Sequence, residues 1–171
     1  MAELKRGIEI ERKYIIMKPE AELLEKMPDY DSSEITQIYL TSENGVTHRI
    51  RKRVYGGKAK YYETKKTRID RMSVIEDEGE ISAEDFSELK SLTDPRTKTI
   101  HKVRHSFTYK GRCFEIDVYP EWKKTAILEV ELPDRECLVD FPDLIEVCRE
   151  VTGEKGYSNA AMSMSFPKEI I

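Results

Sequence analysis

The stretch Glu9-Ile10-Glu11-Arg12-Lys13-Tyr14, near the N-terminus, has a pattern that the rest of the chain repeats. As a β-strand, it places Glu9, Glu11 and Lys13 on one face and its isoleucine and tyrosine on the other, because side chains alternate along a strand. Neighbouring charges on that face are about 6.6 Å apart. A single strand of this kind fits a solvent-facing row as well as a binding site, so the pattern of the other strands decides between them.

The composition limits the classes of protein to consider. At 171 residues the chain has the length of one domain, and we expect a single domain spanning 1–171. Charged residues make up 36% of it while the net charge is only −4, so both signs are interleaved. This balance gives no basic footprint for nucleic acid. No apolar run is long enough to span a membrane, and the N-terminus lacks the apolar core of a signal peptide, so we expect a cytoplasmic protein that binds no membrane.

Cysteine and histidine do not indicate a metal site. Cys113, Cys137 and Cys148 are odd in number and far apart in the sequence, which predicts reduced thiols. His101 and His105 are four residues apart, but their segment is predicted as a strand rather than as a metal-binding helix.

Alternation of apolar and charged residues recurs along most of the chain and predicts eight strands. These strands are expected at 9–14, 35–40, 46–55, 60–67, 71–81, 98–110, 112–119 and 125–132. Hairpin turns are expected at Asn44-Gly45, Gly56-Gly57 and Lys110-Gly111, and Gly79 predicts a bulge or a close approach. Apolar positions at helical spacing predict helices at 19–27, 82–92, 142–152 and 159–166.

On nearly every predicted strand the charged side chains share one face. The acids in this phase are Glu9, Glu11, Glu76, Glu78, Glu80, Glu115, Asp117, Glu129 and Glu131. The bases are Lys13, Arg49, Arg51, Arg53, Lys66, Lys102 and Arg104. Because the predicted helices can cover the apolar face, the charged face can close on itself. We therefore expect an α+β, mainly β fold: an eight-stranded antiparallel closed β-barrel, or tunnel, with a charged lumen and helices packed outside.

Two other arrangements produce the same alternation. One is an open sheet whose charged face is solvated, although such a face usually carries Thr, Ser, Gln and Lys rather than rows of acids or arginines. The other is an outer-membrane barrel, which is also apolar outside and polar inside. The missing signal peptide, the amphipathic helices and the lack of aromatic girdles argue against the membrane barrel.

A lumen with this many charges requires a ligand of mixed chemistry, since unpaired buried charges are costly. Rows of arginine and lysine suit phosphate oxygens, and clusters of carboxylates suit hard divalent cations such as Mg²⁺ or Mn²⁺. Together they describe a polyphosphate with its metal. Phosphoryl transfer depends on positioning and charge neutralisation, so the lack of a P-loop or a catalytic triad does not oppose this interpretation.

The ordered motifs resemble those of the CYTH superfamily, the triphosphate tunnel metalloenzymes. The first three matching stretches are Glu9-Ile10-Glu11-Arg12-Lys13 (E-x-E-x-K), Arg49-Ile50-Arg51 (R-x-R) and Tyr61-Tyr62-Glu63-Thr64-Lys65-Lys66 (Y-x-x-T-x-K). The remaining ones are Lys102-Val103-Arg104, Phe114-Glu115-Ile116-Asp117-Val118, Glu129-Val130-Glu131-Leu132, and Glu150-Val151-Thr152-Gly153 with Tyr157-Ser158-Asn159. The resemblance covers about residues 7–162.

This resemblance implies an eight-stranded antiparallel tunnel and a role for each matching residue. Phosphate would be held by Lys13, Arg49, Arg51, Lys66, Lys102 and Arg104, with Lys155 at the tunnel mouth. Metal would be held by Glu9, Glu11, Glu129 and Glu131, with Glu78 and Asp117 assisting. Catalysis would depend on Glu9, Glu11, Lys13 and Glu131. Two points stay open: which of Glu76, Glu78 and Glu80 faces the lumen, and whether Arg53 binds substrate or only neutralises an acid.

Members of this family hydrolyse inorganic or thiamine triphosphate, act as RNA triphosphatases, or cyclise ATP. Few residues here suit recognition of an organic group, so we expect Mg²⁺- or Mn²⁺-dependent hydrolysis of inorganic tripolyphosphate to pyrophosphate and phosphate. The alternatives are a class IV adenylate cyclase, a thiamine triphosphatase, and a non-catalytic polyphosphate or nucleotide binder. The expected partner is a small-molecule triphosphate and not a nucleic acid, and a homodimer is left open.

Overall fold

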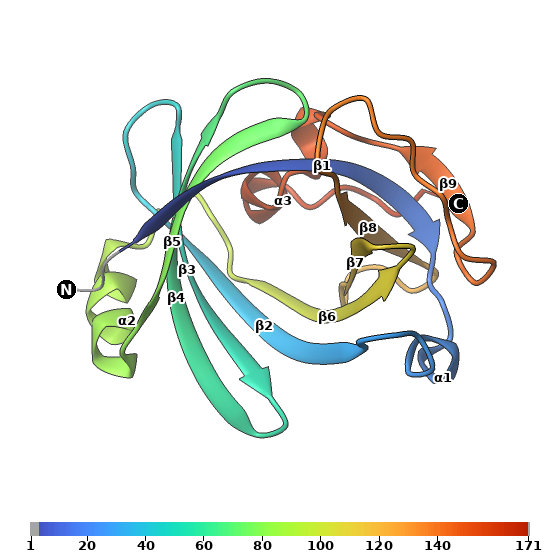
Figure 1. Ribbon diagram of the computed structural model, residues 1–171. Coiled ribbons are helices and arrows are strands. Elements are labelled where there is room, and N and C mark those ends of the chain that lie inside the picture. Colours follow the sequence, from blue (N-terminus) through green and yellow to red (C-terminus); the bar gives the residue numbers. More distant parts are fainter. Residues whose placement is uncertain (1–3, 171) are drawn as a thin grey trace.

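The computed structural model describes residues 4–170, which form a mainly β structure (Figure 1). Its strands are β1 (Lys5–Met17), β2 (Asp31–Leu40), β3 (Val46–Tyr55), β4 (Lys58–Arg68), β5 (Ser73–Ile81), β6 (Ile100–Tyr109), β7 (Arg112–Val118), β8 (Thr125–Glu131) and β9 (Val147–Glu150). The first eight coincide with the eight predicted strands. Between β3 and β4, Gly56 and Gly57 both adopt positive φ, at 51° and 84°, which matches the right-handed twist of a hairpin.

Eight strands close into an antiparallel barrel, as predicted. The order is β5-β4-β3-β2-β6-β7-β8-β1-β9, and an additional pairing of β5 with β1 completes the ring. Strand β9 pairs only with β1 and therefore lies outside the ring. Of the bulge or close approach predicted at Gly79, the bulge does not form, because β4 and β5 pair in one unbroken register in which Gly79 lies opposite Glu63.

The helices are short. They are α1 (Ala21–Leu24), α2 (Ala83–Leu89) and α3 (Asn159–Met164), with 3₁₀ turns at η1 (Lys90–Leu92) and η2 (Lys155–Tyr157). Ser82 caps α2 as predicted, since its hydroxyl accepts a hydrogen bond of 3.0 Å from the backbone N–H of Asp85. None of the helices within residues 4–170 has the length and the apolar character needed to cross a membrane.

The helix predicted at 142–152 is wrong, because this segment contains β9 instead. Strand β5 pairs with β1 only as far as Ile10, and after one further bond, from the Glu11 N–H to the Met72 oxygen, the chain before β5 no longer covers this edge of β1. The backbone of β9 fills part of this edge by pairing with residues 14–16 of β1. Unpaired backbone N–H and C=O groups are costly when buried, so this distant pairing outweighs the local helical pattern.

The apolar core consists of layers around the barrel and a cluster at one end of its interior. Outside, α1 places Leu24 against the wall beside Phe114, and α2 places Phe86 against Ile50. The third cluster contains Ile127, which lies on the same face of β8 as the charged residues, and Met162 of α3. Figure 1 shows α3 within the outline of the strand ring. The prediction of helices packed outside therefore holds for α1 and α2 but not for α3, since the barrel has an apolar end to cover.

Candidate active site in the barrel

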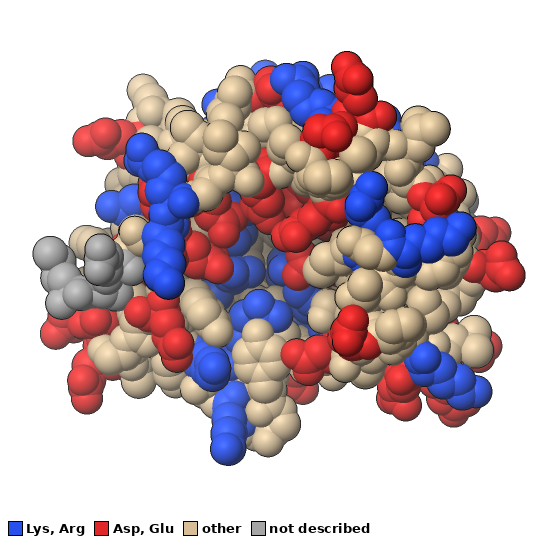
Figure 2. Space-filling view, in the orientation of Figure 1, with Lys and Arg blue, Asp and Glu red and all other residues tan. Residues whose placement is uncertain are grey.

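A cavity of about 420 Å³ lies among the strands of the barrel. Its charged lining residues, which define the charged cavity, are Glu9, Glu11, Lys13, Arg49, Arg51, Arg53, Lys66, Arg68, Glu76, Glu78, Arg104, Glu115, Glu129 and Glu131. They come from seven of the eight barrel strands, and β2 adds Tyr39. Figure 2 shows the hollow, with acidic side chains along its upper rim and basic side chains deeper inside.

Strand register explains why residues distant in the sequence meet here. In the pairing of β1 with β8, Glu11 lies opposite Glu131. In the pairing of β4 with β5, Lys66 lies opposite Glu76. Residues directly opposite each other share one face of a sheet. The rows of charge that alternate with apolar residues are thereby collected on one face of the barrel wall.

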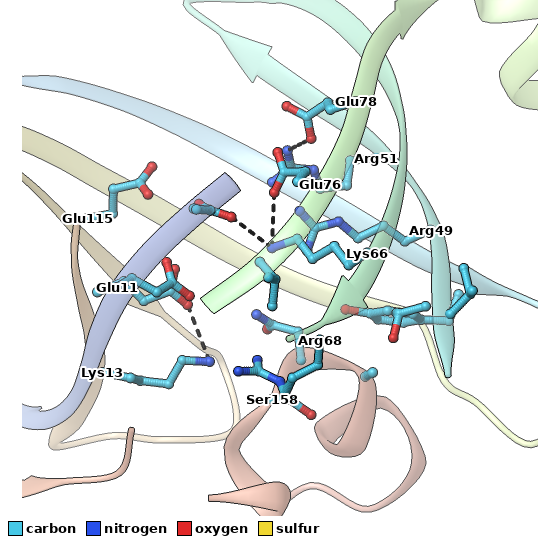
Figure 3. Close-up of a pocket in the computed structure, with 18 of the residues that line it drawn as sticks. Glu11, Lys13, Arg49, Arg51, Lys66, Arg68, Glu76, Glu78, Glu115 and Ser158 are labelled. Carbon is cyan, nitrogen blue, oxygen red and sulfur yellow. Dashed lines mark hydrogen bonds and ion pairs between the residues drawn. The ribbon is translucent and has the colours of Figure 1, made fainter. Parts of the chain in front are cut away.

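Carboxylates hold most of the bases in the charged cavity. Lys66 Nζ lies 3.4 Å from Glu9 Oε2 and 3.3 Å from Glu76 Oε2. Figure 3 shows Lys66 and Glu76 pointing toward each other. The other pairs are Lys13 Nζ–Glu129 Oε1 at 3.4 Å, Arg51 Nη2–Glu78 Oε2 at 2.9 Å and Arg104 Nη1–Glu115 Oε2 at 3.0 Å. These donors suit phosphate oxygens as well as carboxylate oxygens. The charged cavity can therefore exchange internal ion pairs for contacts with a phosphate ligand.

The acids at the β1–β8 side differ in their electrostatic surroundings. Burial, together with the nearby Glu129 and Glu9, raises the pKa of Glu11 well above its ordinary value. Burial also raises the pKa of Glu131, and Glu115 adds to that effect. For Glu129, burial opposes ionisation, but Lys13 and Arg104 outweigh it and lower the pKa to about 2. Negative charge is therefore only partly compensated on this side of the cavity.

Glu11 provides the observation that tests whether a metal fits. Its Oε2 is buried and has no hydrogen-bond partner among residues 4–170. No group of three or more Asp, Glu, His or Cys side chains in that same range is arranged to hold a metal ion as it stands. Mg²⁺, however, is usually held by one or two carboxylates together with water and substrate phosphate oxygens. The all-carboxylate donor set around Glu11 therefore fits a hard divalent cation that binds with its substrate.

The arginines of β3 supply buried positive charge to the same cavity as the carboxylates of β1 and β8. Arg49 and Arg51 are 8% and 4% exposed, and the Nε of each is buried without a hydrogen-bond partner in the described part of the chain. Burial and the neighbouring Arg49 lower the pKa of Arg51 to about 10, so this guanidinium is protonated at neutral pH. Two buried guanidiniums with unused donors form a site that an anion would stabilise.

The chain resembles several solved structures, while no protein-family model and no curated protein matches it. One is the inorganic triphosphatase NE1496, with 26% identity over 93% of this chain and 96% of that chain and a TM-score of 0.57. Another is the PH1819 protein from Pyrococcus horikoshii OT3, with 18% identity over 75% of this chain and 80% of that one and a TM-score of 0.56. A third is HpAC1 from Hippeastrum, with 14% identity over 73% and 80% and a TM-score of 0.52.

These likenesses agree with the closed eight-stranded antiparallel barrel. The chain has the triphosphate tunnel fold of the CYTH superfamily. At the two lower identities the likeness shows the fold alone.

Within this tunnel fold, Lys102 and Asp117, to which the resemblance gives phosphate and metal roles, form a buried ion pair. Neither residue lines the charged cavity. Asp117 Oδ2 lies 3.0 Å from Lys102 Nζ, and Arg104 donates to both Asp117 oxygens, at 2.7 Å and 2.9 Å. The side chains of Lys102 and Asp117 are 0% and 1% exposed, and burial lowers the pKa of Lys102 to about 7 although Asp117 opposes this. Both oxygens of the Asp117 carboxylate are therefore already bonded to Arg104, and one of them also lies against Lys102.

The remaining predicted residues also have definite places in the tunnel. Glu76 and Glu78 line the charged cavity and Glu80 does not, which answers the question that the sequence left open. Arg53 lines the cavity as well, and it donates to the hydroxyl of Ser33 at 3.0 Å. Lys155 lines a second cavity, of about 290 Å³, which we call the adjoining cavity; its other residues include Arg68, Arg71, Met72, Thr152 and Ser158.

From the C-terminal segment, sequence reasoning gave a role only to Lys155 and missed the contacts of Tyr157, Ser158 and Asn159 with the site. Ser158 and Asn159 line the charged cavity. Lys13 Nζ donates to the backbone oxygen of Tyr157 at 3.1 Å, and the Tyr119 hydroxyl donates to Asn159 Oδ1 at 2.7 Å. No local pattern predicts these contacts. Arg68 was also missed, although it is in phase with Lys66, and Glu115 was placed on the charged face without a role.

Proposed function

We propose that this chain hydrolyses a triphosphate, and that its substrate is inorganic tripolyphosphate, which it converts to pyrophosphate and phosphate. The observation that supports this proposal is the charged cavity, in which bases from β3, β4 and β6 face carboxylates from β1 and β8. The likeness to NE1496, an inorganic triphosphatase, agrees with it.

Five bases of the charged cavity would bind the phosphates, and the arginines and lysines would do so in different ways. Arg49, Arg51 and Arg104 present planar forks that can hold two phosphate oxygens at once, and Lys13 and Lys66 act as point charges. When phosphate replaces the carboxylate partners of Lys13 and Lys66, Glu129 and Glu9 become available to the cation that accompanies the substrate. As the bridging P–O bond breaks, these bases neutralise the charge that develops on the phosphate oxygens.

The carboxylates of β1 and β8 would hold the divalent cation, Mg²⁺ or Mn²⁺. We assign this role to Glu9, Glu11, Glu129 and Glu131, because their oxygens are the hard donors that such cations prefer. When bound, the cation neutralises phosphate charge and lowers the pKa of coordinated water. Glu131, which is exposed at the cavity, is the carboxylate available to accept a hydrogen bond from the attacking water.

Asp117 and Glu78 are better suited to positioning bases than to holding metal. Both Asp117 oxygens are engaged by Arg104, and Glu78 Oε2 accepts from Arg51 and from the Thr64 hydroxyl, at 2.9 Å and 2.6 Å. A carboxylate held in this way fixes the direction of a guanidinium. We therefore propose that Asp117 and Glu78 act through Arg104 and Arg51.

A substrate panel tests the proposed function. The purified protein is incubated with tripolyphosphate, thiamine triphosphate and ATP, each with Mg²⁺, with Mn²⁺ and with EDTA, and phosphate, pyrophosphate and cyclic AMP are measured. We expect metal-dependent release of phosphate and pyrophosphate from tripolyphosphate at the highest kcat/KM. Cyclic AMP from ATP would assign a cyclase instead, and binding of tripolyphosphate without turnover in any metal would assign a non-catalytic binder.

A further inference from the structure

The adjoining cavity lies next to the charged cavity. Five residues line both cavities, among them Lys13, Arg68 and Ser158. From there the adjoining cavity extends between the β4–β5 turn and residues 151–155. A linear ligand that leaves the charged cavity on the side of Lys13 and Arg68 would therefore meet Arg71 and Lys155 next.

Arg68 is oriented by neutral groups, so its positive charge is not compensated. Its Nη1 donates to the backbone oxygens of Asp70 and Arg71, at 2.9 Å and 3.1 Å. The Asp70 carboxylate instead accepts from Arg135 at 2.6 Å. Within residues 4–170, the Nε and Nη2 of Arg68 make no hydrogen bond. This differs from the charged cavity, where carboxylates hold most of the bases.

Arg71 is likewise held by a neutral backbone oxygen and not by a carboxylate. Its Nε donates to the backbone oxygen of Thr152 at 2.7 Å, and the next residue, Gly153, has a φ of 71°. A Cβ at Gly153 would lie 2.1 Å from Arg71 Cγ, so the close approach of the arginine requires glycine there. Glu154, which also lines this cavity, lies 3.1 Å from Arg149 and is paired with that residue.

Two fixed guanidiniums without carboxylate partners form a subsite for an anion. The adjoining cavity is lined by the apolar side chains of Met72, Val74 and Val151, and by no aromatic side chain among its described residues. A nucleobase or thiazole ring is usually held by aromatic stacking, so a further phosphate fits this cavity better than an organic group does.

We propose that Arg68 and Arg71 bind the additional phosphates of linear polyphosphates longer than tripolyphosphate, while three phosphates of the same chain occupy the charged cavity. This inference rests on the proposed function. In each turnover one water is consumed: its oxygen bonds to phosphorus as one bridging P–O bond breaks, and its protons go to the departing phosphate oxygen and to solvent. Tetrapolyphosphate then yields phosphate and tripolyphosphate, or two molecules of pyrophosphate.

The test compares Arg68→Gln and Arg71→Gln with wild type on tripolyphosphate, tetrapolyphosphate and ATP. Arg96→Gln is the matched control, since Arg96 is an arginine paired with Asp94 that lines neither cavity. We expect each cavity variant to lose about 10-fold more kcat/KM on tetrapolyphosphate than on tripolyphosphate, as for one lost charge-assisted hydrogen bond. An equal loss on both, no loss on either, or a loss confined to ATP would overturn the proposal.

Calorimetric binding in EDTA separates this inference from the proposed function. Wild type should bind tetrapolyphosphate more tightly than tripolyphosphate, and the two cavity variants should remove that difference. If wild type hydrolyses neither substrate, the proposed function fails while the binding comparison still tests the subsite. Equal affinity of wild type for the two polyphosphates would overturn the subsite. Circular dichroism shows whether each variant is folded. If one of Arg68→Gln and Arg71→Gln does not fold, the other still tests the subsite.

Discussion

At the scale of single residues, Glu11 and Asp117 are both buried carboxylates with opposite electrostatic surroundings. Burial and other carboxylates raise the pKa of Glu11 well above its ordinary value. For Asp117, burial acts in the same direction, but Arg104 and Lys102 outweigh it and lower the pKa far below its ordinary value. The two side chains therefore differ in what their removal does: one affects mainly function and the other mainly stability.

For Glu11→Gln we expect kcat on tripolyphosphate to fall on the order of 100-fold or more, as for loss of a key electrostatic group. The melting temperature should not fall, because a neutral amide replaces a buried carboxylate whose Oε2 has no partner in residues 4–170. Kinetics and thermal unfolding measure both. Glu80→Gln is the control, since Glu80 follows Glu76 and Glu78 in phase but lies outside the charged cavity. A Glu11→Gln enzyme with full activity would remove Glu11 from the site.

For Asp117→Asn we expect a loss of stability of about 3–5 kcal/mol, because one partner of a buried ion-pair cluster disappears while Lys102 and Arg104 stay buried. Urea unfolding at neutral pH measures this. Glu115→Gln is the comparison, since it removes a more exposed partner of Arg104, whose pairing distance is 3.0 Å. Its cost should be clearly smaller, and equal costs would contradict the role assigned to Asp117.

At the scale of elements, Glu169 provides one of the attachments of the C-terminal segment to the barrel. Glu169 accepts hydrogen bonds from the backbone N–H groups of Lys123, Lys124 and Thr125, at 3.1, 2.5 and 2.7 Å. These bonds, with one from the Thr125 hydroxyl, outweigh desolvation and lower the pKa of Glu169 from 4.5 to about 2. Trp122 adds a second link by donating to the backbone oxygen of Pro167 at 2.9 Å.

This anchor predicts part of the pH dependence of stability. A carboxylate with a lowered pKa in the folded state stabilises the fold above its ordinary pKa, and this contribution is lost as the pH falls from about 4.5 to about 2. Glu169→Gln should therefore lower the melting temperature at pH 7 and reduce its slope against pH in that acidic window. Thermal unfolding from pH 7 to pH 2 measures it. A variant with the wild-type profile would show that the anchor contributes nothing.

At the scale of the whole molecule, the barrel interior combines a charged part with an apolar end. Ile127 and Glu129 lie two residues apart on one face of β8, yet Ile127 belongs to the apolar cluster with Met162 and Glu129 lines the charged cavity. Burial of apolar side chains at one end stabilises the fold. In the charged part, repulsion between like charges lowers the stability. Ligands that compensate these charges should therefore stabilise the whole fold.

Tripolyphosphate in EDTA should raise the melting temperature through the bases of the charged cavity. At a concentration 100 times Kd the stabilisation is about 2.7 kcal/mol. For a chain of this size that corresponds to a shift of about 5–10 °C. Differential scanning calorimetry measures it, and sodium sulfate at equal ionic strength is the control for screening. No shift, or the same shift in sulfate, would argue against a specific polyphosphate site.

The sequence predicted most of the barrel because its information there is local. Alternation along each strand, hairpin turns such as Gly56-Gly57 and the cap Ser82 depend on neighbouring residues only. The rows of charge also follow from alternation, since one face of each strand must collect them. The helix expected at 142–152 failed for the opposite reason: β9 forms there because of an open edge on β1, which no property of its own segment reveals.

The sequence by itself determined the number of barrel strands, their phase and the residue types that share each face, because side-chain alternation is a property of the strand. Only the tertiary structure decided which of those charges meet. It placed Glu76 and Glu78 in the cavity but not Glu80, turned Asp117 behind Arg104, and brought the C-terminal segment to the cavity beside Lys13. The reason is that register, barrel closure and chain packing depend on pairings between distant segments, which local patterns do not contain.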